Sequence, residues 1–195
     1  MRTVIVYESL FGNTHQVAEA IEEGIREADP AADVTCVRVG DAGDAHVEDA
    51  DLLVLGGPTH VRGMSRGVTR RMGVKSEQAQ QKAAEPDAVT PEGDATSRRH
   101  HLEPGAEGPG VREWLQGLPK ATGGKAAAFD TRGDSRMAGG AAHGIAKNLR
   151  HHGYQLVAEP EGFIIEDMEG PLRDGERERA KRWAAELVEA RSRPS

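Results

Sequence analysis

The sequence predicts an α/β fold, a doubly wound five-stranded parallel sheet in the order 2-1-3-4-5 with helices on both faces. Short apolar runs alternate with amphipathic helical patterns along the chain. The run at 51–55 is apolar almost throughout, which is typical of a parallel strand covered on both faces. The chain also opens with a strand that runs directly into a polar turn and a helix. These three observations together favour a parallel sheet wrapped by helices.

The elements of the amino-terminal part follow from their apolar periodicity. The apolar runs predict strands at 3–7, 34–39 and 51–55. A helix is predicted at 14–28, and Asp29-Pro30 ends it. The predicted buried face of this helix comprises Val17, Ala18, Ile21 and Ile25.

The carboxy-terminal part continues the alternation. The apolar runs predict strands at 126–129, 154–158 and 162–165. The last two form one fifth strand that is bent or interrupted at Pro160. Helical patterns predict helices at 136–152 and 176–191. The apolar stripe of the last helix consists of Ala180, Trp183, Ala184, Leu187 and Val188.

One segment, at about 75–110, breaks the pattern. It is rich in Pro, Gly, Glu and Gln and has almost no large apolar residues, so it buries too little apolar surface to offset its ordering entropy. We therefore expect one domain over 1–195, with a polar, mobile insertion at 75–110 before a short helix at 111–118. Two roles stay open for the insertion, a lid or partner-docking loop and a solvated excursion without function.

Composition excludes several function classes. The net charge of -7 argues against a nucleic-acid partner, because phosphate-backbone binders need a basic face. No apolar run approaches a membrane span, and the chain opens as a strand without a signal peptide, so we expect a cytoplasmic protein without membrane insertion. Cys36 is the only cysteine and is expected to be a small buried side chain. The paired histidines at 100–101 and 151–152 point apart, which predicts no metal site.

The turn after the first strand has the composition of a phosphate-binding loop. Ser9, Gly12, Asn13 and Thr14 lie between the strand at 3–7 and the helix that follows. Such a turn directs backbone N–H groups and small hydroxyls toward one point at the positive end of a helix. It lacks the Lys of a Walker A loop and the glycine spacing of a dinucleotide fold. The alternative is a structural turn that binds nothing.

This stretch resembles the amino-terminal pattern of the flavodoxin family. Every constrained position of that pattern is met, by Ile5, Val6, Tyr7, Ser9, Gly12, Thr14, Ala18 and Ile21. The resemblance implies a non-covalent FMN cofactor. Its phosphate would be held mostly by backbone N–H groups of Ser9, Leu10, Phe11, Gly12, Asn13 and Thr14. The hydroxyls of Ser9 and Thr14 and the amide of Asn13 would complete the cradle.

The resemblance also implies two loops that hold the isoalloxazine ring. The first follows the third strand and contributes Pro58, Thr59, His60, Val61, Gly63 and Met64. The second follows the fourth strand and contributes Thr131, Arg132, Gly133 and Asp134. The chain departs from the family here, since many flavodoxins stack Trp or Tyr on the ring and these loops contain neither. His60, Met64 and Met137 are the available substitutes.

Three functions are compatible with these features. The first is FMN-dependent electron transfer to partner redox proteins, and the second is an FMN-dependent NAD(P)H or quinone reductase with a small quinone-type acceptor. The third is a non-redox binding module that no longer binds FMN. Acyl transfer is excluded because the chain has no Gly-x-Ser-x-Gly elbow. No residue is predicted as catalytic, and no feature predicts an oligomeric state.

Overall fold

The computed structural model describes residues 1–60, 63–64, 102–103, 105–106, 108–134, 140–167 and 170–192. Its central sheet is parallel and has the strand order β2-β1-β3-β5-β6. These strands are β1 (Arg2–Tyr7), β2 (Asp33–Arg38), β3 (Leu52–His60), β5 (Lys125–Gly133) and β6 (Gln155–Leu156). The predicted order 2-1-3-4-5 is therefore confirmed.

Two further strands complete the sheet. β7 (Glu161–Ile165) pairs with the carboxyl-terminal half of β5, whereas β6 pairs with its beginning. The fifth strand is thus divided in two, as the sequence predicts. β4 (Gly63–Met64) folds back antiparallel onto the end of β3. This hairpin lies at the carboxyl ends of the parallel strands, where ligands bind in sheets of this type.

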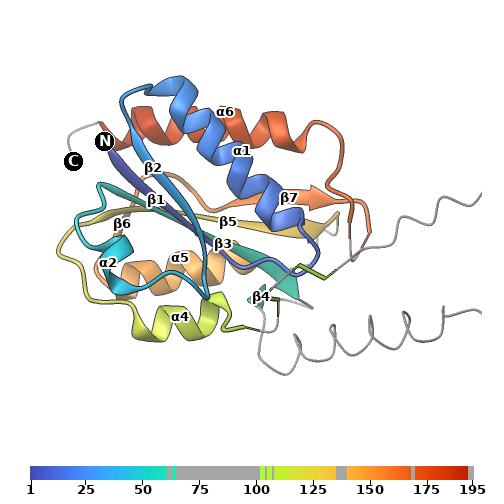
Figure 1. The fold of residues 1–195 in the computed structure, drawn as a ribbon, viewed down its shortest axis with the longest axis horizontal. Helices are drawn as coiled ribbons and strands as arrows, with labels where there is room; N and C mark the ends of the chain where they lie inside the picture. Colours follow the sequence, from blue (N-terminus) through green and yellow to red (C-terminus); the bar gives the residue numbers. More distant parts are fainter. Residues whose placement is uncertain are drawn as a thin grey trace, which may run out of the picture.

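Helices cover both faces of the sheet (Figure 1). α1 (Asn13–Ala28) and α6 (Glu176–Arg191) lie side by side on one face. The opposite face carries α2 (Asp44–Val47), α4 (Val111–Gly117) and α5 (Ala141–His151). The helices predicted at 14–28, 111–118 and 176–191 are confirmed, while α2 is too short for periodicity to reveal it. No helix in the described part of the chain is long and apolar enough to cross a membrane.

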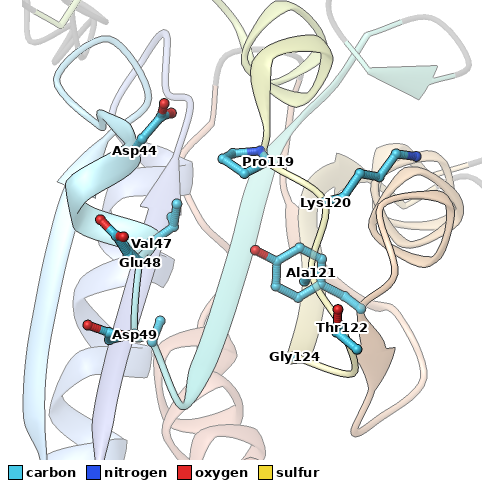
Figure 2. A pocket seen from close by; sticks show the side chains of 11 residues that line it. Asp44, Val47, Glu48, Asp49, Pro119, Lys120, Ala121, Thr122 and Gly124 are labelled. Atoms are coloured by element: carbon cyan, nitrogen blue, oxygen red, sulfur yellow. The ribbon is translucent and has the colours of Figure 1, made fainter.

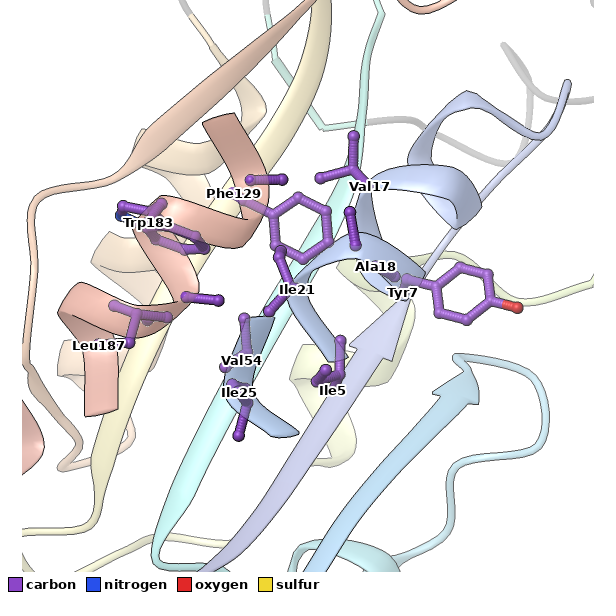
Figure 3. Packing of buried hydrophobic residues seen from close by; sticks show 14 of the residues in the cluster. Ile5, Tyr7, Val17, Ala18, Ile21, Ile25, Val54, Phe129, Trp183 and Leu187 are labelled. Carbon is purple, nitrogen blue, oxygen red and sulfur yellow. The ribbon is translucent and has the colours of Figure 1, made fainter. Parts of the chain in front are cut away.

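The larger core lies between the sheet and the pair α1/α6 (Figure 3). Ile21 and Ile25 of α1 meet Trp183 and Leu187 of α6 above Phe129 of β5, and these five side chains are at most 5% exposed. Burying side chains of this size contributes about 2 kcal/mol each. The second core, under α4 and α5, contains the alternate strand residues. Cys36 is only half-buried at the edge of the first core, and burial raises its thiol pKa to about 12.

The predicted ends of two strands lie too early in the chain. The third was expected to stop at Leu55 and the fourth at Phe129, but β3 continues to His60 and β5 to Gly133. The two extensions pair with each other in parallel register. Gly56 lies within β3, opposite Phe129 of β5. Glycine is required there because a Cβ would overlap the Phe129 ring. The glycines and Pro58, which favour a turn by residue type, are thus strand residues at the carboxyl end of the sheet.

The helix predicted from 136 begins later. Gly140 has extended backbone angles and forms the N-cap of α5, so the helix starts at Ala141. Residues 135–139, with Met137, lie outside the described residues. Most of the insertion predicted at 75–110 also lies outside them, as does His100-His101. Residues 102–103, 105–106 and 108–110 of the insertion are described, and Leu102, Glu103 and Ala106 contact the body of the domain.

Gly24 of α1 lies where α1 and α6 approach each other closely. A Cβ at Gly24 would lie 2.5 Å from the carbonyl oxygen of Lys181 and 2.9 Å from the Ala184 Cβ. We predict that Gly24→Ala lowers the free energy of unfolding by about 1–3 kcal/mol, because overpacking against backbone exceeds the gain in helix propensity. Urea denaturation measures the change.

Gly117→Ala is the matched control, because it also changes a helical glycine but no atom lies within 4 Å of the added Cβ. It should leave the stability unchanged or slightly higher. Equal stability of Gly24→Ala and Gly117→Ala would contradict the close approach of the two helices.

Candidate functional site

The candidate site lies where the chain leaves the carboxyl ends of β1, β3 and β5. β1 is central in the sheet and leads into α1 through residues 8–12. Together with Asn13 and Thr14, the first two residues of α1, we call these residues the phosphate loop. The ends of β3 and β5 pair with each other beside it, with Pro58 opposite Thr131. The crossover from β1 goes to one side of the sheet and that from β3 to the other, so the two connections diverge at this edge.

The phosphate loop is closed by its own serine. Ser9 Oγ accepts a hydrogen bond of 3.1 Å from the N–H of Gly12. Gly12 has φ 87°, a left-handed conformation that favours glycine, and serves as the N-cap of α1. Because Gly12 has no side chain, it cannot cap the first N–H groups of the helix, which have no intrahelical acceptor. Ser9, Asn13 and Thr14 are all buried at this turn.

Two hydroxyl groups join the phosphate loop to β5. Thr14 Oγ1 lies 2.7 Å from Thr131 Oγ1, and both residues are buried. The pair has two hydroxyl protons but uses only one in their mutual hydrogen bond. The second proton therefore remains to be donated to a third group. The structure thus brings together two predicted site residues that are 117 positions apart in the chain.

Asn13 is approached by a segment that the sequence analysis did not include. A Cβ at Gly170, in the connection from β7 to α6, would lie 2.5 Å from Asn13 Nδ2. Gly170 also has φ 111°, so a side chain is disfavoured by conformation as well as by space. The Gly170-Pro171 dipeptide signals a turn, but no local pattern places that turn beside the phosphate loop. We add Gly170 to the candidate site as a packing residue.

Two other helices that begin at the carboxyl end of the sheet, α4 and α5, receive an internal carboxylate. Val111 N–H, the first of α4, donates to Glu8 Oε2 at 2.8 Å. At the start of α5, Ala141 N–H donates to Thr59 Oγ1 and Ala142 N–H to Asp130 Oδ2, both at 2.8 Å. A helix amino terminus stabilises such a negative charge.

Asp130 is the most unusual group near the site and was not among the predicted residues. It is 0% exposed, and its Oδ1 has no hydrogen-bond partner within the described residues. The nearest cation is Arg132, whose Nε lies 3.7 Å from Oδ1. Burial raises the pKa of the Asp130 carboxyl, while the hydrogen bond from Ala142 N–H opposes the shift. An acid directly after a buried strand is the signal that could have identified it.

The residues predicted to hold a ring make different contacts within the protein. Thr59 uses its hydroxyl to accept from Ala141 N–H and to donate to Asp130 Oδ2, so it serves helix capping. Met64 lies against α5, where a Cβ at Gly144 would meet its Cε at 3.2 Å. His60 and Gly63 pair in the hairpin, and Val61 lies outside the described residues.

The predicted residues of β5 diverge. Thr131 faces the phosphate loop, but the Arg132 guanidinium lies against Gly140 and Gly162, where a Cβ at either position would overlap it. Asp134 is exposed and pairs with Arg173 at 2.9 Å. A Cβ added at Gly133 would have no described atom within 4 Å. Of this group, Thr131 alone contacts the phosphate loop through a hydrogen bond that the structure describes.

Aromatic rings are used elsewhere. Phe129, Phe163 and Trp183 form edge-to-face contacts inside the first core. Tyr7 stacks on the imidazole of His15 with ring centroids 4.8 Å apart. Phe11, in the phosphate loop, packs with Leu102 and does not enter the core. None of these rings belongs to the described residues of the two predicted ring loops.

A cleft lies at the opposite end of the strands (Figure 2). Its volume is about 670 Å³. Asp44, Glu48 and Asp49 form one wall, and Lys120 and Thr122 lie on the other. The cleft is near the beginnings of β3 and β5, so it is separate from the phosphate loop. Among the described residues, no cluster of three or more His, Cys, Asp or Glu side chains could hold a metal ion.

Comparisons with known proteins support the architecture. No protein-family model and no curated protein matches the chain. A flavodoxin from the domain Archaea has 18% identity and a TM-score of 0.61, covering 99% of this chain and 100% of that one. Flavodoxin 2 from Bacillus cereus has 16% identity and a TM-score of 0.62, with coverages of 97% and 99%. A flavodoxin, WrbA-like protein from Agrobacterium tumefaciens has 17% identity and a TM-score of 0.53, with coverages of 97% and 96%.

These similarities are at the level of the fold. With the sheet order and the helix placement, they show that the chain has the flavodoxin-like fold that the sequence predicts. The match extends over nearly the full length of both proteins in each pair.

Asp130 gives a testable pH dependence. Its carboxyl has a raised pKa in the folded protein, so the folded state binds the proton more tightly than the unfolded state does. The stability that this proton contributes is complete below the ordinary pKa of 3.8 and is lost as the pH rises toward the folded value. Wild type should therefore lose about 1.4 kcal/mol per pH unit relative to Asp130→Asn in that range.

Urea denaturation of both proteins between pH 4 and 8 measures this difference. The lost hydrogen-bond geometry in Asp130→Asn contributes a constant offset, because the amide does not titrate. A difference in stability that does not change with pH would contradict the raised pKa.

Proposed function

We propose that this chain is an FMN-binding redox protein that transfers electrons through a non-covalently held flavin. The phosphate loop carries the proposal, because its buried hydroxyls, and a helix start at which Gly12 provides no capping side chain, suit a phosphate group. The flavodoxin-like fold supports it, since ligands of such sheets bind at this edge. When bound, FMN supplies the electron-transfer chemistry, and the protein supplies binding and tuning.

The residues present fit a phosphate monoester. The first N–H groups of α1 point out of the helix at its positive end, which favours an anion. Ser9 Oγ accepts from Gly12, so its own proton is available for donation. The pair of Thr14 and Thr131 contributes the further proton described above. Backbone amides and neutral hydroxyls would therefore hold the phosphate without a lysine.

The ring would lie over the ends of β3 and β5. Pro58 and Thr131 are paired residues at the carboxyl ends of β3 and β5, on the side of α1. Asp130 and Thr59 lie on the other side, engaged with α5. We infer that Pro58 and Thr131 are nearer to the ligand than Thr59 and Arg132. This assignment narrows the predicted set of ring contacts.

The electron partner is either another redox protein or a small quinone-type acceptor. The absence of Trp and Tyr from the ring loops favours an open ring face. An open face is the specific feature that supports the second candidate function, an FMN-dependent NAD(P)H or quinone reductase. Oxidation of NAD(P)H by the FMN-loaded protein, in the presence of a quinone, would select the reductase over the carrier. Protein that takes up no FMN would leave the non-redox binding module.

Comparing FMN with riboflavin tests the phosphate loop, since the two ligands differ only in the phosphate. We predict that Thr14→Val weakens FMN binding about tenfold, as expected for loss of one hydrogen bond to a charged group. Riboflavin affinity should stay unchanged, because the substitution conserves side-chain volume. Quenching of flavin fluorescence by the apoprotein measures both dissociation constants.

Thr3→Val is the matched control, because Thr3 is buried at the other end of β1 and its hydroxyl has no partner among the described residues. It should leave both affinities unchanged. The proposal fails if wild type does not prefer FMN to riboflavin.

A further inference from the structure

The described end of the insertion contacts the phosphate loop. Leu102 and Ala106 pack with Leu10 and Phe11 in a small apolar cluster. The N–H of Glu103 donates to the carbonyl oxygen of Leu10 at 2.8 Å. A segment that follows the polar part of the chain is thus attached to the residues proposed to bind phosphate.

The carboxylate of Glu103 joins two basic side chains from separate elements. Its Oε1 lies 2.7 Å from Nδ1 of His15, in the first turn of α1. Its Oε2 accepts a hydrogen bond from the guanidinium of Arg38, the last residue of β2. The side chains of Glu103 and Arg38 are 16% and 15% exposed, so solvent screens this ion pair only in part.

The ring of Tyr7 contacts both basic side chains, His15 and Arg38. The ring of Tyr7, at the end of β1, stacks on His15 with an angle of 11° between the planes. Arg38 Cζ lies 6.0 Å from the centroid of the same ring, within the range of a cation–π contact. Burial raises the pKa of the Tyr7 phenol, and its hydrogen bond with Arg38 opposes this shift. The two basic side chains are therefore held by β1, β2 and α1 as well as by the insertion.

We propose that Arg38 and His15 form an anion-binding site that Glu103 of the insertion occupies, and for which a phosphate group of a ligand competes. A guanidinium held on an aromatic ring is suited to phosphate as well as carboxylate. The site borders the phosphate loop, because a Cβ at Gly12 would lie 3.8 Å from Glu103 Oε1. A ligand with two neighbouring phosphate groups would therefore meet both sites.

Displacement of Glu103 would weaken the attachment of the insertion. The ion pair with Arg38 and the hydrogen bond with His15 would be lost. The contact of Leu102 and Ala106 with the loop and one backbone hydrogen bond would remain. Occupation of the site by an anion would thus be coupled to weaker attachment of Leu102, Glu103 and Ala106, and the coupling is reciprocal. This inference requires no flavin.

Titration of the full chain with inorganic pyrophosphate tests the proposal. Glu103→Gln keeps the shape of the side chain but removes the competing charge, so pyrophosphate should bind about tenfold more tightly than to wild type. Adding Arg38→Met to Glu103→Gln should abolish this gain. Isothermal titration calorimetry gives the three affinities, and the chemical shift of Arg38 Nε–H in the single variant locates the bound anion.

Glu22→Gln is the matched control. Like Glu103→Gln, it removes one negative charge from a carboxylate that accepts a hydrogen bond from an arginine, here Arg26 at 2.7 Å. Glu22 lies in α1, away from the phosphate loop. The proposal is overturned if Glu103→Gln binds pyrophosphate no more tightly than Glu22→Gln, or if the gain survives Arg38→Met. Failure of FMN binding in wild type would overturn the proposed function and leave this result unaffected.

Discussion

The amino termini of α1, α4 and α5 lie at the carboxyl end of the sheet, and each needs an acceptor for its first N–H groups. α4 receives the carboxylate of Glu8, and α5 receives Asp130 together with the hydroxyl of Thr59. α1 starts instead at a left-handed glycine, beside the buried hydroxyls of Ser9 and Thr14. This arrangement keeps both internal carboxylates on the α4/α5 face. It leaves neutral donors on the α1 face, where a ligand anion would bind.

Much of this arrangement could be predicted because it depends on local patterns. The apolar run of β1 and the helical periodicity in α1 identify the buried residues, so the polar residues between them must lie at the carboxyl end of the sheet. The strand order follows from the alternation of strands and helices along the chain. The meeting of Thr14 with Thr131 follows in turn, since both come at carboxyl ends of parallel strands. These parts require no knowledge of distant side chains.

The remaining features depend on contacts between distant segments. Gly56 reads as a turn residue, but the ring of Phe129 requires a glycine within a strand. The start of α5 is set by Thr59 and Asp130, which lie on other elements, so helical periodicity placed it too early. Glu103 lies in a segment with no periodicity, and its partners come from α1 and β2. Sequence patterns report local preference, whereas these positions are decided by tertiary partners.

The two proposed anion sites differ in physical kind although they are neighbours. The phosphate loop offers backbone amides and hydroxyls, so its attraction for an anion is short-ranged and depends on geometry. The pair of Arg38 and His15 offers a cationic group, and the protein neutralises it with Glu103. In a chain of net charge -7, an unneutralised guanidinium would be the stronger attractor for anions at this edge. Because Glu103 occupies Arg38, recognition of a single phosphate in the proposed site would fall to the backbone amides and hydroxyls of the phosphate loop, where shape as well as charge would determine what binds.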